Sequence, residues 1–397
     1  MTEIETQNEK RVSRRELTRR NIRREKNRKN FRTLMIIAFT AVLLYITGIY
    51  GASLAYFGDF ISGGLMLMEI GGGYPVEADY SRLIQAEPMG TGLRVLDADN
   101  FTVYSPTGKS VFTYSHSMTN PVIATSGTRA LIYDLNETSL KIANGHNILF
   151  QQDMPGNIIH ACISSSNRVA VTTRSSGYNG EVSVYNFNMN KRFTWYCAKA
   201  FPIYSSLSDN GKTLAVTTAQ TEGGLLYSSI YIIDSDRGEE LYTIDSTDYP
   251  LTTKFLDNSR LLIAYTGKLV IWDTKNNTKK REYSFPDGSL WSITVNSPYI
   301  AVAYGGYGLA GSGRLTFLSD QLVEKYTVSL TEGIKDLSVS QSRVFALGTE
   351  NLYEYDYNGE LVNTTPTGPL AKTLVDYSGT MMITSTQIRK IENTKSR

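Results

Sequence analysis

The chain contains little cysteine, histidine or tryptophan. Its 397 residues include two cysteines, three histidines and three tryptophans. Cys162 and Cys197 are too few for a disulfide scaffold, so an exported domain of this chain would have to rely on its own hydrophobic core. His116, His146 and His160 lie in different strands or turns and lack the spacing of metal ligands. We therefore expect no metal site here.

Familiar catalytic motifs are missing as well. The chain has no Gly-x-Ser-x-Gly nucleophile elbow and no His-Glu-x-x-His zinc motif. Two pairs of acidic residues stand close together in the sequence, Asp97 with Asp99 and Asp234 with Asp236. Both pairs lie at turns, where carboxylates usually accept hydrogen bonds from their own backbone. The glycine-rich run 305–313 precedes a strand rather than a helix, which favours a long hairpin over a phosphate loop. The sequence thus predicts a non-enzymatic protein without a cofactor.

Long apolar runs are rare, with one exception. Residues 34–57 contain no charged side chain, and at about 1.5 Å per residue a helix of this length can cross about 30 Å of hydrocarbon. Residues 1–32 carry twelve Lys or Arg and five Asp or Glu, a net charge of +7, which leaves −5 for residues 33–397. The positive-inside rule therefore predicts a basic cytoplasmic tail over residues 1–33, a transmembrane helix over 34–57 and an extracytoplasmic remainder.

This N-terminal region has alternative interpretations. The small residues of Ser53-Leu54-Ala55 would suit a signal peptidase, but the basic region and the apolar run are both longer than in a signal peptide, which favours an uncleaved signal anchor. The tail could bind anionic lipid, serve only to set topology, or act as the signalling end of a sensor. The residues that would contact lipid are Arg23, Arg24, Lys26, Arg28, Lys29 and Arg32. We expect no nucleic-acid partner.

Residues 58–73 are flanked by glycine. We expect a Gly-rich, flexible linker whose apolar centre lies at the membrane surface or packs under the following domain. Even fully extended, these sixteen residues reach only about 55 Å. The domain that follows should therefore be held close to the bilayer.

From residue 74 onward, short alternating apolar runs are separated by Gly, Asn, Asp, Ser and Pro, which is typical of strands and turns. One turn-and-strand pattern recurs at steps of 37 to 47 residues, with equivalent positions at Leu93, Ala130, Val169, Leu214, Leu261, Ile300, Val344 and Met381. This period, with about four strands per repeat, is typical of a β-propeller, in which blades bury their sheets by stacking in a ring. We predict an all-β propeller over residues 74–392, with eight blades, or seven as the alternative, and a short tail over 393–397.

The two ends of the repeat region complement each other. The last repeat ends after three strands, at 387–391, whereas residues 74–80 form an orphan strand ahead of the first full repeat. We predict that this orphan strand supplies the fourth strand of the last blade. Such a pairing would close the ring and remove an open sheet edge.

Residues 74–134 carry a family resemblance. They include Tyr74-Pro75-Val76, residues 105–109, Asn120-Pro121-Val122 and residues 127–134. With these features the chain resembles an uncharacterised family, a domain of unknown function found in bacterial single-pass membrane proteins, mostly from Gram-positive anaerobes. The resemblance implies a bacterial host and an extracytoplasmic propeller of quinoprotein-like or WD40-like type. It implies no activity.

Propellers of this type include quinone-dependent dehydrogenases. The cofactor site of such enzymes is a deep axial pocket with a stacking tryptophan and often adjacent cysteines. The two cysteines of this chain are well separated. Trp195, Trp272 and Trp291 are its only tryptophans, and Trp272-Asp273 stands where WD40 repeats carry their Trp-Asp dipeptide. We therefore expect no quinone cofactor.

Three long connections stand out, at residues 174–180, 220–229 and 305–313. Each is rich in glycine and contains a tyrosine: Tyr178, Tyr227 and Tyr307. They fall between the second and third strands of repeats 3, 4 and 6, so a propeller would present them on one face. Tyrosine offers rigid contact area and glycine an adaptable backbone, which suggests a partner-binding face. The alternative is that these loops merely tolerate length.

These features together predict a membrane-anchored, extracytoplasmic propeller that serves as a non-catalytic protein-interaction scaffold in the bacterial cell envelope. The alternative is a binder of a small molecule or glycan, or a hydrolase, that uses the central channel. A deep axial pocket lined by acids, Arg and Trp would favour the alternative, and a plugged channel would exclude it.

Overall fold

The computed structural model describes residues 62–90, 92–286, 288–306, 313–340, 343–377 and 379–391, together with residues 33, 35, 36, 39 and 59. Its contacts divide the chain into two units, Met1–Gly58 and Asp59–Arg397. The predicted basic tail with its six lipid-contacting residues, the Ser53-Leu54-Ala55 site and nearly all of the predicted transmembrane helix lie outside the described residues. Within the described part of the chain, no helix is long and apolar enough to cross a membrane.

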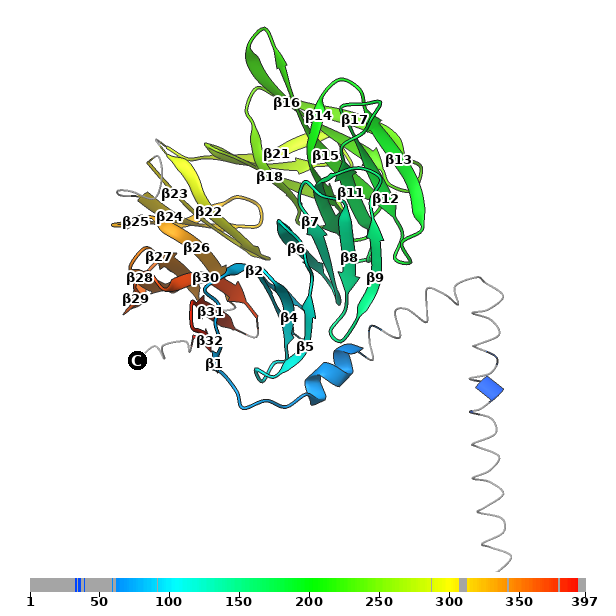
Figure 1. Ribbon diagram of the computed structural model, residues 1–397. Coiled ribbons are helices and arrows are strands. Elements are labelled where there is room, and N and C mark those ends of the chain that lie inside the picture. Colours follow the sequence, from blue (N-terminus) through cyan, green and yellow to red (C-terminus); the bar gives the residue numbers. More distant parts are fainter. Residues whose placement is uncertain are drawn as a thin grey trace, which may run out of the picture. The chain divides into compact units, whose positions relative to one another are not determined.

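The second unit is an eight-bladed β-propeller, in which eight antiparallel sheets of four strands form a ring (Figure 1). Blades 1 to 4 consist of β2 (Leu83–Met89), β3 (Gly92–Asp97), β4 (Asn100–Tyr104), β5 (Ser110–Ser115); β6 (Pro121–Ser126), β7 (Arg129–Asp134), β8 (Ser139–Ala143), β9 (Ile148–Asp153); β10 (Ile158–Ile163), β11 (Val169–Thr173), β12 (Gly180–Tyr185), β13 (Lys191–Cys197); and β14 (Phe201–Leu207), β15 (Thr213–Glu222), β16 (Leu225–Asp234), β17 (Glu239–Ser246).

Blades 5 to 8 complete the ring. They consist of β18 (Pro250–Phe255), β19 (Arg260–Tyr265), β20 (Lys268–Asp273), β21 (Thr278–Ser284); β22 (Ser289–Asn296), β23 (Tyr299–Gly305), β24 (Gly313–Ser319), β25 (Glu324–Leu330); β26 (Ile334–Val339), β27 (Val344–Gly348), β28 (Asn351–Tyr355), β29 (Leu361–Pro366); and β30 (Ala371–Asp376), β31 (Thr380–Thr384), β32 (Gln387–Lys390), β1 (Val76–Glu77). The prediction of eight blades is confirmed.

The second strand of each blade is the most deeply buried. It contains the equivalent positions of the sequence repeat, from Leu93 in β3 to Met381 in β31, and at each of the eight the side chain is at most 1% exposed. These apolar side chains pack between neighbouring sheets, for example Ala130 of blade 2 against Leu96 and Phe101 of blade 1. The repeat therefore arises because every blade needs an apolar strand at the same depth.

The ring closes as the sequence predicts. Strand β1 pairs antiparallel with β32, with Val76 opposite Ile388. Two further backbone bonds continue the pairing, from Ala78 N to Thr386 O at 3.1 Å and from Tyr80 N to Ser385 O at 2.8 Å. An N-terminal strand thus forms the outer edge of the last blade.

The first strand of each blade lines the axis and departs from regular pairing. Seven of these eight strands contain a bulge or irregularity near their beginning. A bulge shifts the alternation of side chains and re-aims the next residue. Polar residues that follow these bulges line the axial cavity: Gln85, His160, Tyr204, Thr252, Asp336 and Thr373.

The tether segment, defined as residues 59 and 62–73, is more ordered than its glycines indicate. Residues 62–68 form a short helix, and the Met66 side chain is 1% exposed within the apolar cluster of blades 1 and 2. Met66 thus packs under the propeller, which is one of the two positions expected for the apolar centre, and packing holds this part of the expected linker.

Ring closure can be tested at β1. Val76 is partly buried against Ile388 and its neighbours, so Val76→Asp should lower the free energy of unfolding by about 1–3 kcal/mol because it places a charge among apolar side chains. Urea unfolding of the full chain measures this change. Glu77→Ala, at an exposed position of the same strand, is the control and should stay within about 0.5 kcal/mol of the parent. Equal midpoints for both variants would contradict a stabilising closure.

Candidate functional site

The propeller has two different faces. Because all strands within a blade are antiparallel, the connections between second and third strands, and those between blades, emerge on one face, which we call the hairpin face. The other turns emerge on the opposite face, which we call the tether face because the tether segment packs there. Two hydrogen bonds establish that packing. One lies between Ser62 and His146, in the turn between β8 and β9, and the other runs from the Gly71 N–H to Thr107, in the turn between β4 and β5.

The Gly-rich loops at 174–180 and 220–229 lie on the hairpin face, between second and third strands as predicted. Of the third loop, residues 307–312 lie outside the described part of the chain. Tyr178 is exposed, and its ring lies 4.7 Å from that of Tyr196. Tyr227 is half-buried and pairs with Gln220 in the β15–β16 hairpin. This hairpin continues beyond the residues that pair with β14 and β17 and projects from the ring in Figure 1. Tyr307 lies outside the described residues.

Exposed apolar side chains gather around these loops. Besides Ile84 in blade 1 and Leu370 beside blade 8, the exposed large apolar residues on the hairpin face lie at the ends of the consecutive blades 3, 4 and 5: Tyr178, Tyr196, Phe201, Leu225, Leu226, Tyr249 and Leu251. On the tether face, by contrast, the exposed apolar residues of the blades are scattered: Leu149, Leu241, Val323, Tyr326 and Leu361. We call the first group the apolar rim. A concentration of this kind typically marks an interaction surface.

The axis of the ring holds a second candidate site. Two cavities of about 710 Å³ and 670 Å³ lie at the axis, and both are lined by Gln85, Glu87, Lys254, Ile293 and Val295. We refer to the two cavities together as the channel. The axis therefore contains open space that side chains do not fill. The walls of the channel include the acids Glu87, Asp336 and Asp376, but no Arg or Trp among the described residues, so only part of the predicted signature of a channel binder is present.

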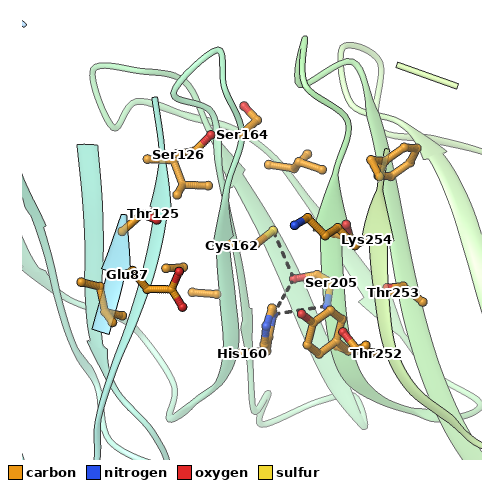
Figure 2. Close-up of a pocket in the computed structure, with 18 of the residues that line it drawn as sticks. Glu87, Thr125, Ser126, His160, Cys162, Ser164, Ser205, Thr252, Thr253 and Lys254 are labelled. Carbon is orange, nitrogen blue, oxygen red and sulfur yellow. Dashed lines mark hydrogen bonds between the residues drawn. The ribbon is translucent and has the colours of Figure 1, made fainter. Parts of the chain in front are cut away.

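Opposite charges face each other across this channel. Figure 2 shows Glu87 and Lys254 pointing into the cavity from opposite walls. Burial raises the pKa of Glu87. The hydrogen bond from Gln85 and the positive charge of Lys254 lower it, but by less than burial raises it. Asp336 also has a raised pKa because of burial, although its carboxylate accepts hydrogen bonds from Thr373 and the Leu374 backbone. The Lys254 side chain is exposed to the channel and has no hydrogen-bond or ion-pair partner among the described residues.

One wall contains a Ser–His–Cys group. His160 Nδ1 lies 3.2 Å from Ser205 Oγ, and the Cys162 thiol lies 3.8 Å from the same oxygen (Figure 2). Burial lowers the pKa of His160 to about 4, so the ring is neutral at physiological pH. Ser205 is fully buried, and the His160 ring packs against that of Tyr204 at 3.9 Å. A substrate could not reach this serine, so the group stabilises the wall rather than forming a nucleophile.

The acid pairs and the glycine-rich run that the sequence offered as candidate sites have structural roles. Asp97 Oδ1 accepts the backbone N–H groups of Asp99 and Asn100, and Asp234 Oδ1 those of Asp236 and Arg237. The interpretation of both acid pairs as turn residues is confirmed. The glycine-rich run 305–313 links the paired strands β23 and β24, so it is a hairpin as predicted.

The sequence alone did not reveal the channel residues. Glu87, Lys254 and Asp336 lie on first strands, whose alternation is broken by the bulges and which lack the apolar pattern of second strands. The usable signal is a charged residue in an otherwise apolar or hydroxyl-bearing strand, as in 250–255. That signal identifies a channel residue only when the blade boundaries are known, because they show which strands are first strands.

Comparisons with known proteins identify the fold and no activity. A family model described as "Family of unknown function (DUF5711)" matches residues 72–392. A search of curated protein sequences returned no match.

Three solved structures share the architecture at low identity. BamB from Moraxella catarrhalis aligns with 11% identity and a TM-score of 0.54, over 81% of this chain and 100% of that chain. Sqt1 from Saccharomyces cerevisiae aligns with 10% identity and a TM-score of 0.60, over 80% and 98%. The dihydro-heme d1 dehydrogenase NirN, in complex with DHE, aligns with 13% identity and a TM-score of 0.56, over 72% and 66%. These similarities show the fold alone.

The channel wall can be tested through its cysteine. Both cysteines are free, and burial raises the pKa of the Cys162 thiol to about 11. In a Cys197→Ala variant, Cys162 should therefore react with a disulfide reagent about two orders of magnitude more slowly than free cysteine at about pH 8, because only the thiolate attacks. The rate should rise with pH. A rate equal to that of free cysteine would contradict the raised pKa of this partly buried thiol in the wall.

Proposed function

We propose that this chain, which belongs to the family of unknown function DUF5711, is a membrane-anchored, extracytoplasmic scaffold of the bacterial cell envelope that binds a partner protein on its hairpin face and catalyses no reaction. The apolar rim is the observation that carries the proposal. Its seven exposed side chains occupy three consecutive blades and surround the loops that contain Tyr178 and Tyr227. Tyrosine and phenylalanine at such a rim provide the large, rigid contacts that dominate protein interfaces.

The anchor is supported by the sequence. The apolar run 34–57 follows a tail with a net charge of +7, the arrangement that keeps an N-terminus in the cytoplasm. The absence of disulfides from the described residues places the burden of stability on the eight apolar clusters between blades. An exported domain of this size can be stable on that basis.

A crosslinking experiment on intact bacterial cells tests the proposal. A membrane-impermeant lysine crosslinker should capture a partner, because Lys199 is exposed beside the apolar rim. A combined Tyr178→Ser, Tyr227→Ser and Tyr307→Ser variant should lose most of this capture because the aromatic contacts are removed. Mass spectrometry of the crosslinked complexes provides the measurement.

The matched control removes apolar side chains from the other face. Tyr326→Ser with Leu361→Ser changes two exposed residues at the tether-face ends of blades 6 and 7 and should leave the captured proteins unchanged. An identical set of captured proteins for the parent and the tyrosine variant would argue against the hairpin face. Failure of the reagent to label the chain at all would argue against its extracytoplasmic position.

A second candidate function uses the channel. The unpaired Lys254 opposite Glu87 favours a small acidic sugar, whose carboxylate would reach Lys254 and whose hydroxyl groups would donate to Glu87. Glucuronate at millimolar concentration should then raise the melting temperature of the parent protein, and glucose should raise it less. Lys254→Met should abolish the difference, whereas Lys275→Met, at a tether-face turn, should preserve it. Equal melting temperatures with and without glucuronate would count against this candidate.

A further inference from the structure

The tether segment has an apolar side that the propeller leaves uncovered. Leu65, Leu67, Met68 and Ile70 are 49%, 61%, 75% and 78% exposed. Four large apolar side chains within six residues are unusual on a surface that faces only water. Their exposure contrasts with Met66, in the same helix, which is 1% exposed.

The other side of the segment is firmly attached to the propeller. Asp59 forms an ion pair with Arg129 of blade 2, with 2.8 Å between Oδ2 and Nε, and both side chains are nearly buried. Ser62 Oγ lies 2.9 Å from His146 Nδ1. At the far end, Glu69 pairs with Lys109 of blade 1. These contacts follow one side of the segment, so its orientation on the tether face is determined.

Two glycines make room for this attachment. A Cβ atom on Gly92 would lie 2.6 Å from Met66 Sδ, and one on Gly145 would lie 2.3 Å from Met66 Cε. Any side chain at either position would displace the methionine. The Met66 side chain is thus inserted between blades 1 and 2, and the helix cannot roll to hide its exposed apolar side.

The sequence indicates what covers that side. The apolar run 34–57 ends two residues before Asp59, a distance of at most about 7 Å. A membrane span that ended this close to Asp59 would bring the apolar side chains of the tether segment within reach of the membrane surface. Apolar side chains on such a segment are buried in the lipid interface, as they are in helices that lie on membranes.

We propose that residues 65–70 rest on the outer surface of the lipid bilayer, with Leu65, Leu67, Met68 and Ile70 in the lipid interface and Met66 in the propeller. The proposal rests on the membrane anchor of the proposed function. It assigns an interaction surface to lipid and sets the orientation of the ring. The tether face of blades 1 and 2 is turned toward the bilayer, and the hairpin face with its apolar rim points away from it.

Spin labels on the full chain test this arrangement. In a background of Cys162→Ala and Cys197→Ala, one variant carries Ile70→Cys and its matched control carries Leu225→Cys, at a leucine on the hairpin face that is 63% exposed. Each is labelled with a nitroxide and reconstituted into phosphatidylcholine–phosphatidylglycerol nanodiscs. Oxygen concentrates in lipid, whereas a nickel chelate stays in water. At position 70 collisions with oxygen should exceed those with nickel, and at position 225 the ratio should be reversed.

The outcomes separate the two proposals. A chain that enters nanodiscs but shows the aqueous ratio at both positions overturns the lipid contact and leaves the anchor intact. A label at position 70 that is shielded from both reagents indicates cover by protein and also overturns it. A chain that fails to enter nanodiscs overturns the anchor and the lipid contact together. A Leu67→Cys label in the same background should repeat the result for position 70, which guards against an effect of one substitution.

Discussion

The pairing of β1 with β32 is the constraint on which the rest of the structure depends. A propeller blade cannot bury both faces of its sheet alone, and a ring with an open joint would expose both a sheet edge and the apolar faces beside it. Here a two-residue strand at the N-terminal end closes that joint. The tether segment immediately before it crosses blades 2 and 1, so one continuous stretch joins three blades.

The N-terminal stretch that closes the ring makes the blades different from one another, although their core positions repeat eight times. The core positions repeat with little change from blade to blade, since every second strand must fill the same space. The surface does not repeat. Blades 1 and 2 hold the tether segment on one face, and blades 3 to 5 carry the apolar rim on the other. Function is therefore expected where the repetition is broken.

Sequence reasoning succeeded where a physical requirement recurs. Ala130 and Val344 could be placed because each fills a position that every blade must fill with an apolar side chain, and Tyr74 to Tyr80 because a ring must close. It failed for contacts that occur once. The ion pair of Asp59 with Arg129 joins residues 70 apart, and no local pattern announces it. The channel residues were missed because bulges in the first strands remove the alternation from which inward positions are inferred.

The two candidate surfaces differ in what they require of the fold. A ligand in the channel contacts first strands from several blades, so its binding would depend on the register of every joint, including β1 with β32. The apolar rim depends only on blades 3 to 5, and its longest element, the β15–β16 hairpin, extends beyond both neighbouring strands. A rim of this kind can change its partner through a few exposed residues without altering the core. A scaffold benefits from a binding surface that can vary independently of the core while the opposite face is held by the tether segment. A channel binder gains nothing from that arrangement. This difference favours the hairpin face as the functional surface.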